Sequence, residues 1–322
     1  MKAIFFDKKL NFVRNYPTPV PGVNEALVRI RMTGICNTDL EIIKGYMGFR
    51  GIIGHEFVGV IEKINGKTQR LIGKRVVGEI NCGCGTCDWC RKGLKNHCPE
   101  RTTIGIAKKD GAFAEYITLP NDNLLEVPEN ISDEEAVFTE PLAAAFEIME
   151  QIHIKPADKI LVMGDGKLGI LCSLALNLAH ADVTLMGKHE KKLKIAEGQH
   201  VSTVKLKDLK ISKAYDIVVE ATGAAEGFGM ALQLVKPRGT VVLKSTVAEG
   251  RETNLAPVVI DEISVIGSRC GPFKKALRAL SGKLIDVKPL ITGIYPFDGA
   301  EEALRKAAKR DSLKVIIDFR HG

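Results

Sequence analysis

Residues 160–169 read ILVMGDGKLG, and this stretch decides the fold of one half of the chain. The apolar run ILVM predicts a buried strand, and the helix-like KLGILCSLALNLA begins directly after it at residue 167. Gly164, Gly166 and Gly169 form a G-x-G-x-x-G pattern between that strand and that helix, which is typical of dinucleotide binding. The glycines permit a tight turn, a close approach of the pyrophosphate and close helix–strand packing, and the helix N-terminus attracts phosphates. The alternative is an ordinary glycine turn.

The alternation of strand and helix continues on both sides of this turn. Helix-like segments are expected at 140–152 and 190–197, and further strands at 182–186, 215–220, 240–244 and 264–267. Apolar strands that alternate with amphipathic helices predict a parallel sheet with helices on both faces. We therefore expect an α/β fold with a doubly wound domain over residues 141–271.

The remaining residues predict a second domain that is rich in β-strands. Residues 1–140 hold short β-like runs broken by Gly and Pro, at 27–32, 57–64, 75–80 and 115–119. The C-terminal residues 272–322 contain the helix-like DGAEEALRKAAKR and the strand-like LKVIIDF, and we expect them to complete this β-rich domain. Two domains agree with a length of 322 residues, at roughly 150 residues per domain.

Composition excludes several classes of protein. The chain is 45% hydrophobic and 26% charged, as in globular proteins and unlike disordered, collagen-like or coiled-coil ones. No uncharged apolar run reaches the ~18 residues of a membrane span, and the N-terminus lacks a secretory signal. A cytoplasmic protein with no membrane partner is therefore expected. The net charge of +7 is mild and gives no argument for nucleic acid.

The end of the second strand of the doubly wound domain bears on cofactor choice. NAD-binding domains place an acidic residue there to bind the ribose 2′-hydroxyl. This chain has Gly187 at that position, followed by Lys188 and His189, and Lys192 one turn later. A small residue followed by cations favours the 2′-phosphate of NADP over NAD. The alternative is that most of the lysines between 188 and 213 form a solvated surface.

Four cysteines close together predict a metal site. Cys84, Cys87, Cys90 and Cys98 follow the spacing C-x2-C-x2-C-x7-C, and four thiolates can surround one Zn²⁺ with no position left open. This describes a structural zinc that stabilises a lobe at about residues 82–98. Neither Cys82 nor His97 is expected to bind it. An iron–sulfur cluster, a disulfide knot and a nucleic-acid-binding zinc module are the alternatives, and the last lacks the expected basic and aromatic residues.

A second set of metal-ligand side chains is dispersed along the chain. Cys36 lies in GICNTD, His55 and Glu56 in GHEFVG, and Glu140 in TEPLAA. A cysteine, a histidine and a carboxylate together would bind zinc with one position open for water or substrate. Each residue also has an ordinary explanation: a buried thiol, a core histidine and an acid at a helix N-terminus. Sequence spacing alone does not bring them together.

These motifs occur in the same order in one family. GICNTDLEI, GHEFVGVIE, the four-cysteine lobe, TEPLAAA and VMGDGKLG resemble the zinc-dependent medium-chain dehydrogenase/reductase family over essentially the whole chain. The resemblance implies a GroES-like catalytic domain joined to a Rossmann domain. It implies Cys36, His55 and Glu140 as catalytic-zinc ligands, and Glu56 as a ligand or as a group that exchanges with Glu140 or water. The same resemblance makes Asp39 the residue that orients His55, and Thr38 the relay for the substrate proton.

The resemblance also names the residues expected to contact the dinucleotide, and the sequence departs from the family at three points. The expected contacts are Gly164, Gly166, Lys167, Leu168, Gly169, Gly187, Lys188, His189, Lys192, Ala221, Thr222, Gly223, Lys244 and Ser245. Glu41 stands where some members carry a relay histidine, and Gly187 replaces the acidic residue of NAD-specific members. The segment between Cys36 and His55 is short, which predicts an altered substrate pocket.

The expected function follows from these sites. The chain would transfer hydride between a hydroxyl of an alcohol, polyol or sugar, or the matching carbonyl, and a nicotinamide cofactor, with NADP preferred over NAD. Two Zn²⁺ per chain are expected, one catalytic and one structural. A homodimer or homotetramer is usual in the family, and no nucleic-acid partner is expected. The alternatives are a zinc-free quinone reductase-like enzyme and a non-catalytic NADP-binding regulatory protein.

Overall fold

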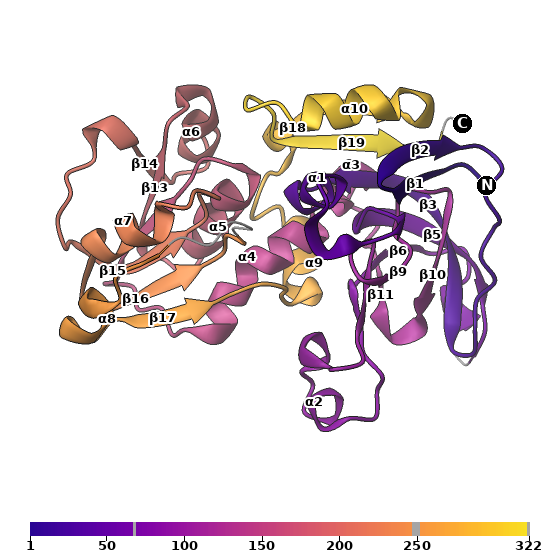
Figure 1. Cartoon of the computed structure of the whole chain (residues 1–322), viewed down its shortest axis with the longest axis horizontal. Coiled ribbons are helices and arrows are strands. Elements are labelled where there is room, and N and C mark those ends of the chain that lie inside the picture. Colours follow the sequence, from indigo (N-terminus) through magenta and orange to yellow (C-terminus); the bar gives the residue numbers. More distant parts are fainter. Residues whose placement is uncertain (67–68, 247–251, 321–322) are drawn as a thin grey trace. The chain divides into compact units, whose positions relative to one another are not determined.

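The computed structural model describes residues 1–66, 69–246 and 252–320, which form two compact units (Figure 1). One unit comprises Met1–Glu140, Leu280–Gly282 and the chain from Leu290 onward, and the other comprises Pro141–Ala279 and Lys283–Pro289. The first boundary lies where the sequence placed it. The return to the β-rich unit differs from the expected residue 272, because α9 (Phe273–Ser281) and the segment after it belong mostly to the other unit.

The second unit is built on a six-stranded parallel sheet. Its strands are β12 (Lys159–Met163), β13 (Asp182–Gly187), β14 (Ser202–Lys205), β15 (Tyr215–Glu220), β16 (Val235–Leu243) and β17 (Ser264–Gly267). They lie in the order β14-β13-β12-β15-β16-β17, and every neighbouring pair is parallel. Counted along the chain this order is 3-2-1-4-5-6, that of a Rossmann domain. The predicted fold class is confirmed.

Besides α9, the described residues of this unit form the helices α4 (Thr139–Gln151), α5 (Lys167–Asn177), α6 (Glu190–Glu197), α7 (Gly227–Leu234) and α8 (Ala256–Ile260). Strands covered on both faces read as continuous apolar runs. In agreement, Ile160, Leu161, Val162 and Met163 of β12 are all fully buried.

The first unit contains a seven-stranded sheet. Its strands are β3 (Glu25–Ile35), β5 (Glu56–Ile64), β6 (Arg75–Gly78), β10 (Tyr116–Pro120), β11 (Leu124–Glu126), β18 (Ile291–Pro296) and β19 (Lys314–Asp318). The order is β11-β6-β5-β3-β19-β18, and β10 also pairs with β3. A second sheet, β2-β1-β4, comprises β1 (Ala3–Asp7), β2 (Lys9–Val13) and β4 (Gly51–Ile52).

The C-terminal residues complete this first unit. β19 pairs antiparallel with β3, so a strand from the end of the chain lies beside the strand that leads to Cys36. Helix α10 (Ala300–Ala307) buries Ala300, Ala303, Leu304 and Ala307, the spacing of an amphipathic helix that faces a core. Figure 1 shows α10 along the strands β18 and β19.

Three short helices and a small sheet also belong to the described part of the first unit. Helix α1 (Asn37–Ile43) follows β3, and α3 (Asp133–Ala136) begins at a capping box formed by Ser132 and Glu135. The predicted cysteine lobe contains α2 (Asp88–Arg91) and lies next to the sheet of β7 (Asn81–Cys82), β8 (Thr102–Ile104) and β9 (Lys108–Lys109). Within the described residues, no helix has the length and apolar character to cross a bilayer.

Candidate active site and metal centres

Cys36 lies between the end of β3 and the start of α1, where it is the N-cap residue of the helix. Its backbone N–H donates to Asp39 Oδ2 at 2.8 Å, so the first turn of α1 is closed by its own carboxylate. The Thr38 hydroxyl lies 3.8 Å from Cys36 Sγ and is half-buried. The start of α1 thus places a thiol and a hydroxyl next to each other.

His55 and Glu56 are positioned by the turn into β5. Gly54 has a φ of +95°, and a Cβ there would lie 2.1 Å from the Phe113 ring, so only glycine fits this turn. His55 Nδ1 lies 3.1 Å from Asp39 Oδ1. Because a carboxylate accepts, this contact places the ring proton on Nδ1 and leaves the lone pair of Nε2 for a ligand. Asp39 therefore orients His55, as expected.

The charges around His55 favour a cation. Burial lowers the pKa of His55, but Asp39 and the Cys36 thiol together raise it, and the net pKa lies well above 6.5. His55 and Asp39 are 3% and 0% exposed, so water does not screen their interaction. The carboxylate and thiol beside the ring therefore favour positive charge at this position, and a metal bound at Nε2 would compete with the proton there.

Cys36, His55 and Glu56 each bring one candidate ligand atom into the same cluster. These atoms all lie within 4.8 Å of one another. Glu56 is fully buried, and its Oε1 has no hydrogen-bond partner in the structure. A buried carboxylate oxygen without a partner is costly unless a cation faces it. The thiol, imidazole and carboxylate are the donor types of a catalytic zinc site, so the residues fit such an ion.

Sequence reasoning missed Lys314, which pairs with the other oxygen of Glu56. Lys314 is the first residue of β19, is fully buried and forms an ion pair with Glu56 Oε2. The ion pair lies against Gly34 of β3. A Cβ at Gly34 would lie 2.5 Å from Glu56 Oε2, so a larger residue there would collide with the pair. The Lys314 ammonium also lies 5.7 Å from the centre of the Phe138 ring. The position of Lys314 inside the apolar run LKVIIDF could have indicated a buried lysine, which needs an acidic partner.

Glu140 is not brought into this group. It is the second residue of α4 and is half-buried, but it is not among the side chains whose ligand atoms lie within 4.8 Å of one another. Its role as a zinc ligand stays a prediction. Glu41, at the position of a relay histidine in some relatives, pairs with Lys44 at 2.8 Å.

The four cysteines predicted to bind structural zinc do converge. The Sγ atoms of Cys84, Cys87, Cys90 and Cys98 all lie within 4.8 Å of one another. The backbone N–H of Cys84 donates to Cys98 Sγ, and that of Cys87 donates to Cys84 Sγ, each at 3.4 Å. Hydrogen bonds from Thr86 and the backbone lower the pKa of Cys84 to about 6, whereas desolvation and the neighbouring thiols raise the pKa of Cys90 to about 11.

Cys82 stands apart from these four, as expected. It is buried, and burial raises its pKa to about 11. The Asn123 side-chain amide donates to its Sγ at 3.6 Å. All eight cysteines lie in the described part of the chain and are free thiols.

The glycine turn after β12 has the geometry that pyrophosphate binding needs. Gly164 has a φ of +116°, and a Cβ there would lie 2.6 Å from the Ala221 carbonyl oxygen. At Gly169 a Cβ would lie 1.9 Å from the Gly164 oxygen, whereas Gly166 has open space around it. Gly166 is the N-cap of α5, and Lys167 and Leu168 open that helix. The open space around Gly166 lies at the N-terminus of this helix, where helix dipoles attract anions, so the residues fit a dinucleotide phosphate.

The loops that follow β15 and β16 lie next to each other at the carboxyl edge of the parallel sheet. Ala221, Thr222 and Gly223 follow β15, and the Gly223 N–H donates to Ser245 Oγ at 2.8 Å. The buried Glu220, which sequence reasoning missed, accepts from the Thr222 N–H at 2.8 Å.

The Lys244 side chain is directed into its own domain. Its ammonium donates to the Ala144 carbonyl at 2.6 Å, and to Ser268 Oγ and the Arg269 carbonyl at 3.2 Å each. Contact between Lys244 and the cofactor stays a prediction, and the ammonium is already engaged by these three acceptors.

At the end of β13, Lys188 and His189 are exposed, as the prediction of a phosphate contact requires. Lys192 differs, because it is only 9% exposed and lies on the buried face of α6. The backbone N–H groups of Lys188 and His189 both donate to Asp165, the middle residue of the G-D-G turn.

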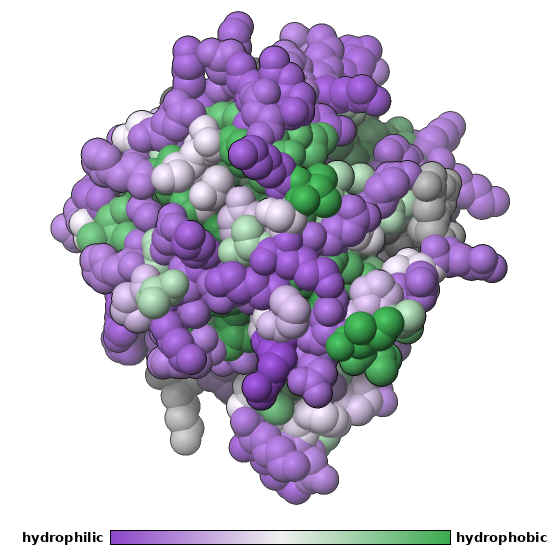
Figure 2. Space-filling view, turned by 90° about the vertical axis from the view of Figure 1, so that its left-hand side faces the viewer, coloured by the Kyte–Doolittle hydropathy of each residue, from purple (hydrophilic) through white to green (hydrophobic). Residues whose placement is uncertain are grey.

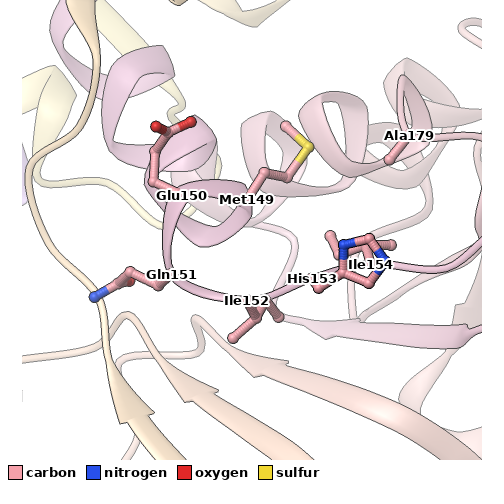
Figure 3. A pocket seen from close by; sticks show the side chains of 7 residues that line it. All are labelled: Met149, Glu150, Gln151, Ile152, His153, Ile154 and Ala179. Atoms are coloured by element: carbon pink, nitrogen blue, oxygen red, sulfur yellow. The ribbon is translucent and has the colours of Figure 1, made fainter.

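A surface pocket of about 410 Å³ lies elsewhere in this unit, where α4 ends (Figure 3). It is lined by Met149, Glu150, Gln151, Ile152, His153, Ile154 and Ala179. These residues include none of the candidate ligands or cofactor contacts. In Figure 3 the Glu150 and Gln151 side chains point in different directions, so they offer no common site for a ligand.

A Rossmann domain with an intact phosphate-binding turn, joined in one chain to two clusters of metal ligands, defines a class: the metal-containing nicotinamide-dependent dehydrogenases. Residues 22–129 match the model of the alcohol dehydrogenase GroES-like domain, and residues 134–319 match that of the glucose dehydrogenase C-terminus. The chain therefore belongs to the zinc-dependent medium-chain dehydrogenase/reductase family, and it is an oxidoreductase.

Individual relatives agree over nearly the whole length. A sorbitol dehydrogenase of Halalkalibacterium halodurans is 26% identical, over 95% of this chain and 94% of the relative. An alcohol dehydrogenase of Escherichia coli CFT073, solved with NADH, matches with a TM-score of 0.89 and 26% identity over 99% of both chains. A zinc-binding dehydrogenase of Sinorhizobium meliloti 1021, solved with NADP, matches with a TM-score of 0.88 and 27% identity over 99% of both chains.

Proposed function

We propose that this chain is a zinc-dependent dehydrogenase that transfers hydride between a hydroxyl of an alcohol, polyol or sugar, or the matching carbonyl, and a nicotinamide cofactor. The convergence of Cys36, His55 and Glu56 within 4.8 Å is the observation that carries the proposal. The unpartnered Oε1 of buried Glu56 adds to it, since a buried carboxylate oxygen is costly without a partner and a bound cation would supply one. The family and the sorbitol dehydrogenase relative support the substrate class.

Each residue of the site has a proposed role. Cys36, His55 and Glu56 would hold the catalytic zinc, which as a Lewis acid favours the ionised form of the substrate hydroxyl. Asp39 fixes the orientation of His55 through the 3.1 Å contact with Nδ1. Thr38, next to Cys36, would accept the hydroxyl proton on its Oγ1 and pass its own proton outward. Glu140 would be a carboxylate that exchanges with Glu56 or water.

A second zinc would lie in the cysteine lobe. Four thiols leave no position open for substrate, so this ion would stabilise the lobe and take no part in the reaction. We therefore propose two Zn²⁺ per chain.

For the cofactor we retain NADP as the proposed preference over NAD. Gly187 offers no carboxylate of its own, and the exposed Lys188 and His189 follow it. Lys192 is a weaker candidate than the sequence indicated, because it is buried on α6.

We further propose a homodimer or homotetramer and a cytoplasmic location. β17 lies at the edge of its sheet and its Val265 is 40% exposed, while Val259 and Ile260 of the preceding helix α8 are each 76% exposed. An open strand edge with apolar neighbours favours pairing with a second copy. Cysteines spaced for metal binding are typical of a reducing compartment.

The test combines metal analysis with two variants, Cys36→Ser and His55→Ala. The parent should contain two zinc ions per chain and reduce NADP or NAD with some member of a panel of alcohols, polyols and aldoses. Each variant should retain one zinc, bind NADPH or NADH with unchanged affinity and lose turnover by about 10³-fold or more. Asp88→Asn, an exposed carboxylate outside both clusters, is the matched control and should behave like the parent.

Two results would contradict the proposal. Turnover that survives removal of the metal and both substitutions would indicate a zinc-free reductase of the same fold. Tight dinucleotide binding without turnover on any alcohol or carbonyl would instead favour a regulatory binding protein.

A further inference from the structure

Asp165, between the first two glycines of the phosphate-binding turn, lies against the end of the neighbouring strand β13. A Cβ built on Gly187 would lie 2.5 Å from Asp165 Cβ and 2.7 Å from Asp165 Oδ2. The Asp165 side chain thus fills the space that a side chain at position 187 would need. This explains why residue 187 is glycine in this chain.

The place that this carboxylate occupies has a known role in cofactor recognition. In the dinucleotide-binding fingerprint, the acidic residue that binds the ribose 2′-hydroxyl stands at the end of the second strand. That strand is β13 here, and it ends at Gly187. The chain therefore lacks the acid in its usual sequence position but has a carboxylate beside that position, supplied by the turn after β12.

The contacts of Asp165 leave one of its oxygens out. Oδ2 accepts from the Lys188 N–H at 2.7 Å, from the His189 N–H at 2.6 Å and lies 3.0 Å from His189 Nδ1. All three contacts share Oδ2, and the side chain is 12% exposed. Oδ1 takes part in none of these three contacts, so it can accept a hydrogen bond from a hydroxyl group.

The same contacts disfavour an added phosphate. The N–H groups of Lys188 and His189 precede α6, where the backbone dipoles would attract an anion. Asp165 already supplies an anion to both groups. A 2′-phosphate brought to this strand end would meet a carboxylate rather than free N–H donors, and like charges repel strongly where water is partly excluded.

We propose that Asp165 is a cofactor-specificity residue, which accepts a hydrogen bond from the adenosine ribose hydroxyl and repels a 2′-phosphate. This inference rests on the proposed dinucleotide-dependent function and refines it. The exposed Lys188 acts in the opposite direction, since its cation attracts the phosphate. The choice between NADP and NAD is then set by the balance of these two side chains, and Asp165 limits the preference for NADP.

The test compares the binding of NADH and NADPH to the zinc-loaded parent and to Asp165→Asn. Asparagine has the same shape and still accepts the two N–H bonds, but it carries no charge. The ratio of the two dissociation constants, measured by cofactor fluorescence titration, should shift toward NADPH by about tenfold or more. Asp158→Asn is the matched control, because Asp158 caps the loop at the opposite end of β12 through the Lys155 N–H at 2.8 Å. Its ratio should equal that of the parent.

A second variant protects the test against misfolding. Asp165→Ser also removes the charge and retains a hydrogen-bond acceptor. The ratio of dissociation constants is compared in whichever of the two variants has the same Tm as the parent. An unchanged ratio in a folded variant overturns the role of Asp165 and leaves the proposed function intact. A zinc-loaded parent that binds neither dinucleotide overturns both.

Discussion

Glu56 has two carboxylate oxygens in different environments, and this difference is the central feature of the site. Oε2 pairs with Lys314, and Oε1 has no partner, although both side chains are fully buried. One carboxylate thus meets a fixed cation through Oε2 and keeps Oε1 without a hydrogen-bond partner, and one of its two oxygens lies within 4.8 Å of ligand atoms of Cys36 and His55. In the metal-free protein, Lys314 supplies the positive charge that balances the buried Glu56 carboxylate.

Replacing Lys314 should therefore affect the metal-free protein most. In Lys314→Met a buried charge loses its partner, which costs about 3–5 kcal/mol of unfolding free energy. Zinc beside Glu56 would supply the missing positive charge and recover much of this loss. Thermal unfolding with and without a chelator should show a larger zinc-dependent rise in Tm for the variant than for the parent.

The double variant Lys314→Met/Glu56→Gln is the control for this effect. It removes both charges together, so its metal-free form should be more stable than that of Lys314→Met alone. Equal Tm values for the parent and Lys314→Met in the absence of zinc would show that the ion pair contributes nothing to folding.

Gly187 shows how a residue-scale expectation can change with the structure. From the sequence, an aspartate at position 187 is expected to shift the preference from NADP towards NAD. In the structure a Cβ at this position would lie 2.5 Å from Asp165 Cβ, so Gly187→Asp would displace the phosphate-binding turn itself. Loss of cofactor binding in that variant would report steric damage, and Asp165 is the better position for the test.

At the scale of elements, strand order brings the candidate metal ligands together. β3 lies between β5 and β19, with Gly34 opposite Glu56 and Ile35 opposite Val315. Cys36 at the end of β3 therefore comes next to the start of both neighbouring strands. Ligands separated by about 20 residues, and a lysine separated by more than 250, meet because three strands share one register.

The cysteine lobe depends on its ligands more than on a core. Its short helix α2 buries none of its residues, and Trp89 and Leu94 are 47% and 41% exposed. Cys98→Ser should remove one zinc per chain and lower the Tm, because the metal supplies folding free energy that the packing does not. Metal analysis and calorimetry on the same sample measure both effects.

Cys82→Ala provides the comparison for this prediction. Cys82 is a buried thiol near the lobe, but its Sγ is not one of the four that converge. The variant should keep both zinc ions and lose only the packing of one small side chain. If Cys98→Ser retained its zinc and melted like Cys82→Ala, the lobe would not be a metal site.

At the scale of the whole molecule, the surface supports self-association at one edge of the parallel sheet. The view in Figure 2 is mostly hydrophilic, with small separate apolar areas, in agreement with the many exposed lysines of residues 188–213. Large apolar side chains are exposed at α8, which precedes β17 in the chain. Its N-cap residue Leu255 is 59% exposed, and Val259 and Ile260 are each 76% exposed.

Ile260→Glu should therefore weaken the proposed dimer. Sedimentation velocity at micromolar concentration should show the parent as a dimer or tetramer and this variant as a smaller species, because a carboxylate would be buried at the contact. Ile211→Glu is the matched control, since Ile211 is 54% exposed in the same unit but far from β17 in the sequence. A monomeric parent, or equal behaviour of the two variants, would contradict the proposal.

The sequence by itself determined the features whose residues lie close together along the chain. The G-D-G-K-L-G turn, the four-cysteine spacing and the β/α alternation are local patterns, in which turn geometry, metal coordination and helix or strand periodicity act over a few residues. The parallel sheet and the cysteine cluster were predicted correctly for this reason. The position of the first domain boundary followed from the change of pattern near residue 140.

Only the tertiary structure decided which distant side chains meet. It brought Glu56 rather than Glu140 into the group with Cys36 and His55, and it paired Glu56 with Lys314. It directed the Lys244 ammonium into its own domain and buried Lys192 on α6. It also placed the Asp165 carboxylate beside Gly187. These outcomes depend on strand register and side-chain direction, which a linear spacing does not encode.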